Sequence, residues 1–97
     1  MKHKTEELSD ELLDAAVAKA MGLGRVPSAI WQPSRNWEHG GPIIERERIT
    51  VGPAASKRYG WWAGQPADHR EDSYGPTPLI AAMRAYVAGK VGEEVEL

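Results

Sequence analysis

Hydrophobic residues follow a helical spacing in two stretches of the chain. The first lies between Leu8 and Gly22, and Ser9 or Asp10 is suited to cap its start. Its apolar positions are Leu12, Leu13, Ala16, Val17, Ala20 and Met21. The polar residues between them are expected to face water: Glu11, Asp14 and Lys19. This pattern predicts an amphipathic helix that ends at Gly22 to Gly24.

The second helical stretch follows Tyr74-Gly75-Pro76. Thr77 is suited to cap it, Pro78 falls at the first helical position, and Gly89 is placed to end it. Its apolar positions are Leu79, Ile80, Met83, Tyr86 and Val87. They predict an amphipathic helix of about three turns. Because a helix start presents free N–H groups and positive dipole, it is also a suitable seat for an anion.

From Arg48 the period changes to two, which predicts a strand with Ile49 and Val51 on one face. Residues 52–56 are typical of a turn, and residues 57–63 of the returning strand. Gly60 inside that strand suggests a bulge or the close approach of another backbone. Residues 64–76 are polar and are expected to form a long loop, either functional or disordered. A two-stranded hairpin is marginal alone and needs a helix on one face.

The segment between the first helix and the strands leaves alternatives open. Pro27 and Pro33 exclude a long helix there. Asn36 is suited to cap a helical turn that begins at Trp37, although the sequence Gly40-Gly41-Pro42 weakens a helix. Alternatively, Pro42 starts a turn that holds Ile43 and Ile44. The predicted fold class is α+β, with two helices packed on a small antiparallel β-hairpin or short meander.

Composition narrows the class of protein. The chain has 97 residues with no Cys and no Phe, but with four Trp and three Tyr. We expect a single domain over residues 1–97, with an ordered core at about 8–89 and a mobile polar start and acidic tail. So small an aliphatic core favours a homodimer or higher oligomer. No apolar run is long enough for a membrane span, so no membrane partner and a cytoplasmic location are expected. A net charge of −2 disfavours broad nucleic-acid binding.

Trp61-Trp62 is the most informative pair of residues. Adjacent strand residues point to opposite faces, so burying one ring exposes the other unless something covers it. Three interpretations stay open: core packing of both rings, an interface, or a platform on which a flat ligand stacks.

Other candidate groups are weaker. Asp68-His69, with Asp72, suggests an acid–base pair or a metal site, although solvated loop residues explain them as well. His39-Gly40-Gly41 suggests a phosphate-cradling turn, with an ordinary turn favoured. Without a recognisable constellation of nucleophile, acid and base, we expect no enzyme, no metal and no cofactor. Arg84 lies nearly two turns beyond the Thr77 cap, so Arg70 is the better cation for an anion there. The candidate ligand-binding residues are Trp37, His39, Trp61, Trp62, Arg70, Thr77 and Arg84.

Several short segments carry a resemblance to a known family. They are Leu8-Ser9-Asp10, Ala20-Met21-Gly22, Trp31-Gln32-Pro33-Ser34, Gly41-Pro42-Ile43-Ile44-Glu45, Ile49-Thr50-Val51 and the segment from Pro78 to Ala85. In these segments the chain resembles the NinX-like family of small phage and prophage proteins, a domain of unknown function. The resemblance implies a phage origin and a non-structural accessory role, and it supplies no reaction.

Two functions remain after these exclusions. The first is non-enzymatic binding of a small anionic ligand, such as a nucleotide immune signal that the protein would sequester as a sponge. The alternative is a protein–protein interaction module that docks on a host or phage protein through an exposed Trp face.

Overall fold

The computed structural model describes residues 1–27, 29–55, 60–65 and 72–97. Within these ranges the chain forms three α-helices, one short 3-10 helix and two antiparallel sheets. In chain order the elements are β1 (Lys2–Lys4), η1 (Thr5–Glu7), α1 (Asp10–Ala20), α2 (Trp37–Glu47), β2 (Thr50–Pro53), β3 (Trp61–Gly64), β4 (Ser73–Gly75), α3 (Pro78–Val91) and β5 (Glu94–Glu96). The α+β class is therefore confirmed, but with a third helix and a second sheet beyond the prediction.

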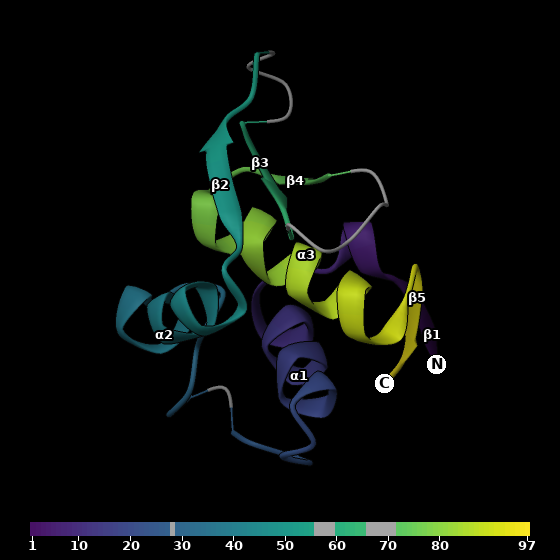
Figure 1. Ribbon diagram of the computed structural model, residues 1–97. Coiled ribbons are helices and arrows are strands. Elements are labelled where there is room, and N and C mark those ends of the chain that lie inside the picture. The colour runs from purple at the N-terminus through teal and green to yellow at the C-terminus, as the bar shows by residue number, and fades with distance from the viewer. Residues whose placement is uncertain (28, 56–59, 66–71) are drawn as a thin grey trace.

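Helix α3 is the centre of the molecule. It lies between the sheet β2-β3-β4 on one side and helices α1 and α2 on the other (Figure 1). Its buried residues are Leu79, Ile80, Ala81, Ala82, Met83, Ala85, Tyr86, Val87 and Ala88. An amphipathic helix was thus the wrong prediction, because layers on both sides bury it. Small alanines let those layers approach the helix closely.

The predicted start of α3 is confirmed. Thr77 Oγ1 accepts a hydrogen bond from the backbone N–H of Ile80 at 3.1 Å, and Pro78 is the first helical residue. The predicted end at Gly89 is wrong, since the helix continues to Val91 and Gly92 caps it. A single glycine near the end of a helix is tolerated when the flanking turns are packed, as Ala88 is here.

Helix α2 lies in the segment for which the sequence left two alternatives, and it is the helix that begins at Trp37. Asn36 Oδ1 accepts from the N–H of Glu38 at 2.9 Å, and the helix then continues through Gly40-Gly41-Pro42 to Glu47. A Cβ atom at Gly40 would overlap the carbonyl oxygen of Pro33 and would lie 2.7 Å from Leu79 Cδ2. Gly40 is therefore the residue that allows α2 to pack against α3, which offsets its poor helix propensity.

The main sheet has the order β2-β3-β4, with all neighbours antiparallel. Strand β2 begins at Thr50, because Arg48 takes the left-handed conformation that ends α2. Strand β4 lies in the segment that the sequence predicted as a loop. The close approach predicted at Gly60 is confirmed, since a Cβ atom there would lie 2.7 Å from the carbonyl oxygen of Gly75. Residues 56–59 of the predicted returning strand lie outside the described residues.

The two ends of the chain form the second sheet. Lys2, His3 and Lys4 pair with Glu96, Val95 and Glu94, and Figure 1 shows both termini beside the end of α3. Thr5 donates from its backbone N–H to Glu93 and from its hydroxyl to Gly92, both at 2.8 Å. The sequence predicted mobile ends here. Their mobility stays a prediction, and in the structure Thr5 and Val95 are buried against the folded chain.

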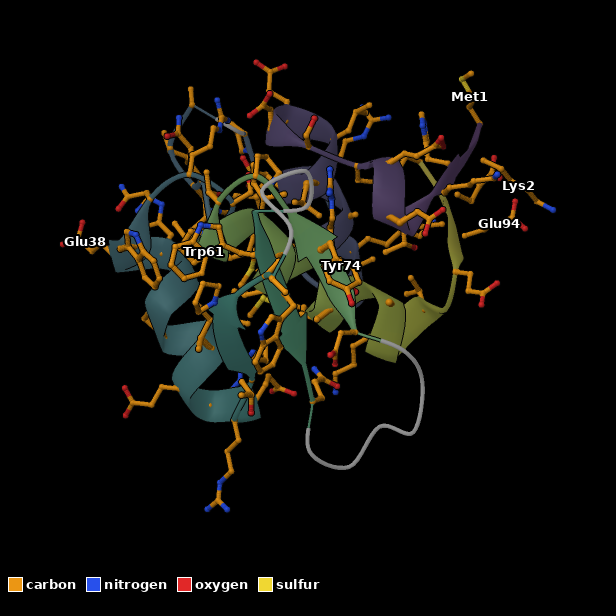
Figure 2. All side chains as sticks on the ribbon, turned by 90° about the horizontal axis from the view of Figure 1, so that it is seen from above. Met1, Lys2, Glu38, Trp61, Tyr74 and Glu94 are labelled. Atoms are coloured by element: carbon orange, nitrogen blue, oxygen red, sulfur yellow. The ribbon has the colours of Figure 1, made fainter. Side chains whose placement is uncertain are left out.

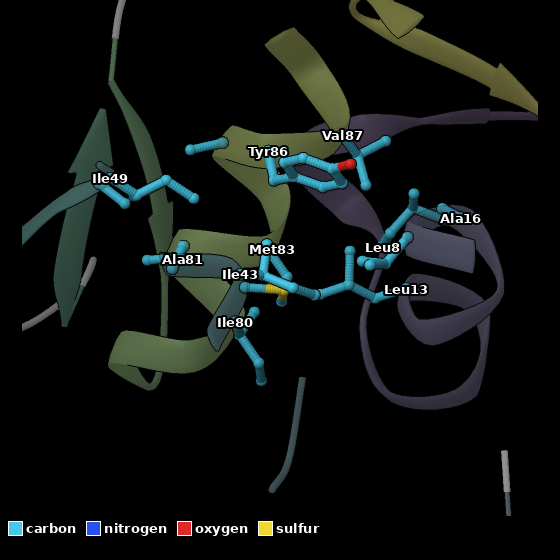
Figure 3. Close-up of a cluster of buried hydrophobic side chains, with 14 of the residues drawn as sticks. Leu8, Leu13, Ala16, Ile43, Ile49, Ile80, Ala81, Met83, Tyr86 and Val87 are labelled. Carbon is cyan, nitrogen blue, oxygen red and sulfur yellow. The ribbon is translucent and has the colours of Figure 1, made fainter. Parts of the chain in front are cut away.

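The core lies where α3 meets α1, α2 and the sheet. Figure 3 shows its side chains, among them Leu8, Leu13, Ile43, Met83 and Tyr86. Two predictions for α1 are wrong: Leu12 is 47% exposed, whereas Asp14 is only 2% exposed. In the part of the chain that the structure describes, no helix is long and apolar enough to cross a membrane.

Candidate binding surfaces

The two adjacent tryptophans lie on opposite faces of the main sheet, as the strand period predicted. Trp61 and Ala63 face α3, and Ala63 is completely buried. Trp61 pairs with Gly75, where a Cβ atom would lie 2.8 Å from the backbone nitrogen of Ala81 in α3. This inner face is therefore pressed against the central helix. Both indole rings are partly buried, so neither is completely enclosed.

Trp62 occupies the outer face, on the side away from α3. A Cβ atom at Gly52, its cross-strand neighbour on β2, would lie 2.7 to 2.9 Å from three atoms of the indole ring. The three similar distances indicate that one face of the ring lies over Gly52. On the other side Trp62 pairs with Tyr74 of β4, which is 42% exposed and is labelled in Figure 2. Trp62 and Tyr74 are defined here as the aromatic face.

The start of α3 offers less to an anion than the sequence suggested. Pro78 has no N–H, the N–H of Ile80 donates to the Thr77 hydroxyl, and the N–H of Ala81 donates to the Thr77 carbonyl. Of the N–H groups in this first turn, that of Leu79 is the one with no hydrogen bond inside the described structure. An anion at this position would therefore receive one backbone donor and the helix dipole.

Trp61 lies close to this helix start, and the first turn of α2 approaches it from another side. Gly75, the cross-strand neighbour of Trp61, is two residues before Thr77. Gly40, one turn after Trp37, contacts Leu79 of the same helix start. In Figure 2 the labelled Trp61 and Glu38, the residue after Trp37, lie at the same side of the molecule. Trp37 itself is 55% exposed. The first turn of α2, which carries Trp37, and strand β3, which carries Trp61, thus both lie near the start of α3.

Arg84 has a structural role. Its Nε donates to the carbonyl oxygen of Leu8 at 2.8 Å, and a terminal nitrogen donates to the carbonyl oxygen of Tyr74 at 2.7 Å. Burial lowers the pKa of the Arg84 guanidinium, and the negative charge of Glu6 opposes this shift. The side chain therefore ties strand β4 to the segment before α1.

His39 lies within α2 and not in a phosphate-binding turn, which corrects that interpretation. The N–H groups of His39 and Gly40 both donate to the carbonyl oxygen of Asn36, so they are not free for a ligand. His39 Nδ1 accepts from the N–H of Gln32 at 2.9 Å and holds the turn that precedes the helix. His39 follows Trp37 by two residues, so the two side chains project from different sides of α2.

Three of the sequence candidates cannot be placed. Arg70, Asp68 and His69 lie outside the described residues. Within the described ranges, no group of three or more His, Cys, Asp or Glu side chains could hold a metal ion.

Sequence reasoning missed the buried carboxylate of Asp14. Its Oδ1 accepts from the N–H of Ser34 at 2.8 Å, and its Oδ2 pairs with Arg35 at 3.0 Å. These bonds fix the segment that leads into α2. A signal was present, because Asp14 stands between Leu13 and Val17 on the apolar side of α1, where a polar residue needs a buried partner.

A shallow groove of about 300 Å³ was also missed. It lies between the sheet of β1 and β5 and helix α1, and it is lined by Lys2, His3, Lys4, Glu7, Leu8, Leu12 and Glu94. Its walls carry both positive and negative side chains, so charge favours no particular ligand.

Together these features define a small α+β protein with an aromatic sheet face and a central helix whose start lies near α2 and β3. The family model described as "Bacteriophage P22, NinX" matches residues 4–90. Because this match covers most of the chain, the protein belongs to that phage family, as its short segments suggested. No curated protein matches the chain.

Proposed function

We propose that this phage protein is a non-enzymatic accessory module that docks on a host or phage protein through its aromatic face. The observation that carries the proposal is the cross-strand pair of Trp62 and Tyr74 on the side of the sheet that no described helix covers. Trp and Tyr are enriched at the centres of protein interfaces, where a rigid ring buries much area at little entropic cost.

Two observations favour a protein partner over a small anion. The first turn of α3 keeps one backbone N–H without a hydrogen bond inside the described structure, because Thr77 takes two others and Pro78 has none. The guanidinium of Arg84 is already engaged by Leu8 and Tyr74. A small anion would therefore meet few donors, whereas an apolar partner surface would meet the exposed ring of Tyr74 and the partly buried ring of Trp62.

The experiment compares two single-ring deletions in the full chain. Trp62→Ala removes the centre of the aromatic face, and Trp37→Ala is the matched control because it removes an exposed ring elsewhere. The expected result is a stoichiometric complex from infected host lysate that survives Trp37→Ala and is lost on Trp62→Ala, with both variants folded by circular dichroism. Equal recovery of the partner by both variants contradicts the proposal. Sedimentation of the purified chain tests whether a second copy takes the face instead, as a dimer lost on Trp62→Ala.

A nucleotide or other small anionic ligand is the second candidate, and a separate observation favours it. Trp61 pairs with Gly75 just before the Thr77 cap, Gly40 brings the first turn of α2 to Leu79, and the N–H of Leu79 makes no hydrogen bond with a described residue. A base stacked on Trp61 would therefore leave its phosphate near the helix start. Such binding fits the sequestering of a nucleotide immune signal. Calorimetry with linear and cyclic nucleotides tests it. A dissociation constant well below about 1 mM, weakened by Trp61→Leu, is expected, and no binding tighter than that limit rejects it.

A further inference from the structure

The aromatic face has a charged neighbour, the carboxylate of Asp72. Gly64 follows Trp62 by two residues on β3, so both belong to the outer face. A Cβ atom at Gly64 would lie 2.5 Å from Asp72 Oδ1, which places the carboxylate over Gly64. Asp72 is exposed, and it makes no hydrogen bond or ion pair with another described residue. A negative group without a counter-charge among the described residues therefore lies on the outer face at Gly64, two positions along β3 from Trp62.

The two groups are suitably spaced for a single side chain. One face of the Trp62 indole lies over Gly52, so its exposed part belongs to the other face and edge. Residues two apart on a strand are separated by about 7 Å, so a long side chain laid along β3 reaches both the indole and the carboxylate. A planar cation satisfies both groups at once, since indole rings attract cations and carboxylates accept charge-assisted hydrogen bonds.

We propose that the partner docks with an arginine side chain, which stacks on the exposed face of Trp62 and donates to the Asp72 carboxylate. This inference rests on the proposed docking function and names the chemistry of the partner. Arginine fits better than lysine, because its guanidinium is planar, weakly hydrated and able to stack while it donates in a fork. An acidic partner segment would be repelled by Asp72.

The experiment titrates the full chain with a short peptide that has one central arginine between glycines, and with the same peptide carrying citrulline, a neutral isostere. The indole N–H signals are followed by NMR, and a Trp62→Phe variant assigns the Trp62 signal. The arginine peptide is expected to shift the Trp62 signal, and citrulline to bind about fivefold more weakly. Asp72→Asn should weaken the arginine peptide about threefold, as expected for an exposed ion pair. Glu38→Gln, which neutralises an exposed carboxylate beside the exposed Trp37, is the matched control and should change nothing.

Three outcomes overturn the inference: no shift with the arginine peptide, equal affinity for both peptides, or equal affinity of wild type and Asp72→Asn. The proposed docking function is tested separately, by the binding of the partner protein to the same variants. A partner protein that is lost on Trp62→Ala but binds Asp72→Asn with the same affinity as wild type rejects the arginine and leaves the docking face. A partner indifferent to Trp62→Ala rejects both.

Discussion

The inner and outer faces of the three-stranded sheet carry one tryptophan each, but the surroundings of these two residues differ. On the inner face Trp61 is next to the completely buried Ala63 and opposite Gly75, and these small residues let α3 approach the strands. On the outer face Trp62 leans over Gly52 beside the exposed ring of Tyr74. The pleat of the strand thus places these two neighbours in the sequence on a packed face and on a solvent-facing one.

The two faces should therefore respond differently to substitution. Changes on the inner face should cost stability, and changes on the outer face should cost binding to the proposed partner. On the inner face a side chain has backbone atoms of α3 as its neighbours, and these cannot move without shifting the helix. On the outer face the neighbours are side chains with room to rotate. Stability should change most with substitutions on the two faces, less at Arg84, and least in the sheet formed by β1 and β5.

The two ring deletions should separate the faces most clearly. Trp61→Ala removes a ring that packs against the core, and we expect it to lower the free energy of unfolding by about 3 kcal/mol. Trp62→Ala removes a ring from the solvent side, and about 1 kcal/mol is expected. Urea denaturation of both variants measures the difference. Equal losses would mean that the outer ring is as important to the fold as the inner one.

The two faces should also differ in how well they tolerate a methyl group added at a glycine. In Gly75→Ala the new Cβ meets the backbone nitrogen of Ala81 at 2.8 Å, so we expect a loss of about 2 kcal/mol from overpacking. In Gly64→Ala it meets the exposed side chain of Asp72, which can turn away, so a loss below about 0.5 kcal/mol is expected. Thermal unfolding of both variants tests this. A costly Gly64→Ala with a tolerated Gly75→Ala would reverse the assignment of the faces.

Arg84 links the outer strand to the rest of the chain. Arg84→Gln shortens the side chain and breaks its bonds to the carbonyl oxygens of Leu8 and Tyr74, so a loss of about 1 kcal/mol is expected. Hydrogen exchange should increase around Leu8 and Tyr74 rather than in the centre of α3. Unchanged exchange at Tyr74 would show that β4 is held without this link.

The smallest effect on stability is expected in the sheet formed by β1 and β5, because its charged side chains face water. A hydrogen bond from the N-terminal amine lowers the pKa of the Glu96 carboxyl, and the charges of that amine, Lys19 and His3 add to the effect. The folded pKa is depressed, so the contribution of Glu96 to stability is present above its ordinary value of 4.5 and is lost as the pH falls through the folded value. Glu96→Gln should therefore unfold at a slightly lower temperature than wild type at about pH 6 and at the same temperature at about pH 2. A difference that persists in acid would point to packing rather than charge.

Local rules written in the sequence determined several parts of this protein. The Thr77-Pro78 start of α3, the first helix, and the opposite faces of Trp61 and Trp62 each depend on residues a few positions apart. Capping, helical spacing and strand alternation act over that range, so they can be deduced without a fold. The short segments likewise identified the family that the chain belongs to.

Only the tertiary structure decided the rest. Gly40-Gly41-Pro42 is helical because Gly40 packs against Pro33 and Leu79, and Asp14 is buried because Ser34 and Arg35 come from the following segment to meet it. The two ends of the chain lie side by side because β1 pairs with β5, which comes from the opposite end of the sequence. Arg84 is removed from the candidate anion site by two distant carbonyl groups. In each case the stabilising partner lies many residues away, and a pattern read along the chain does not contain that contact.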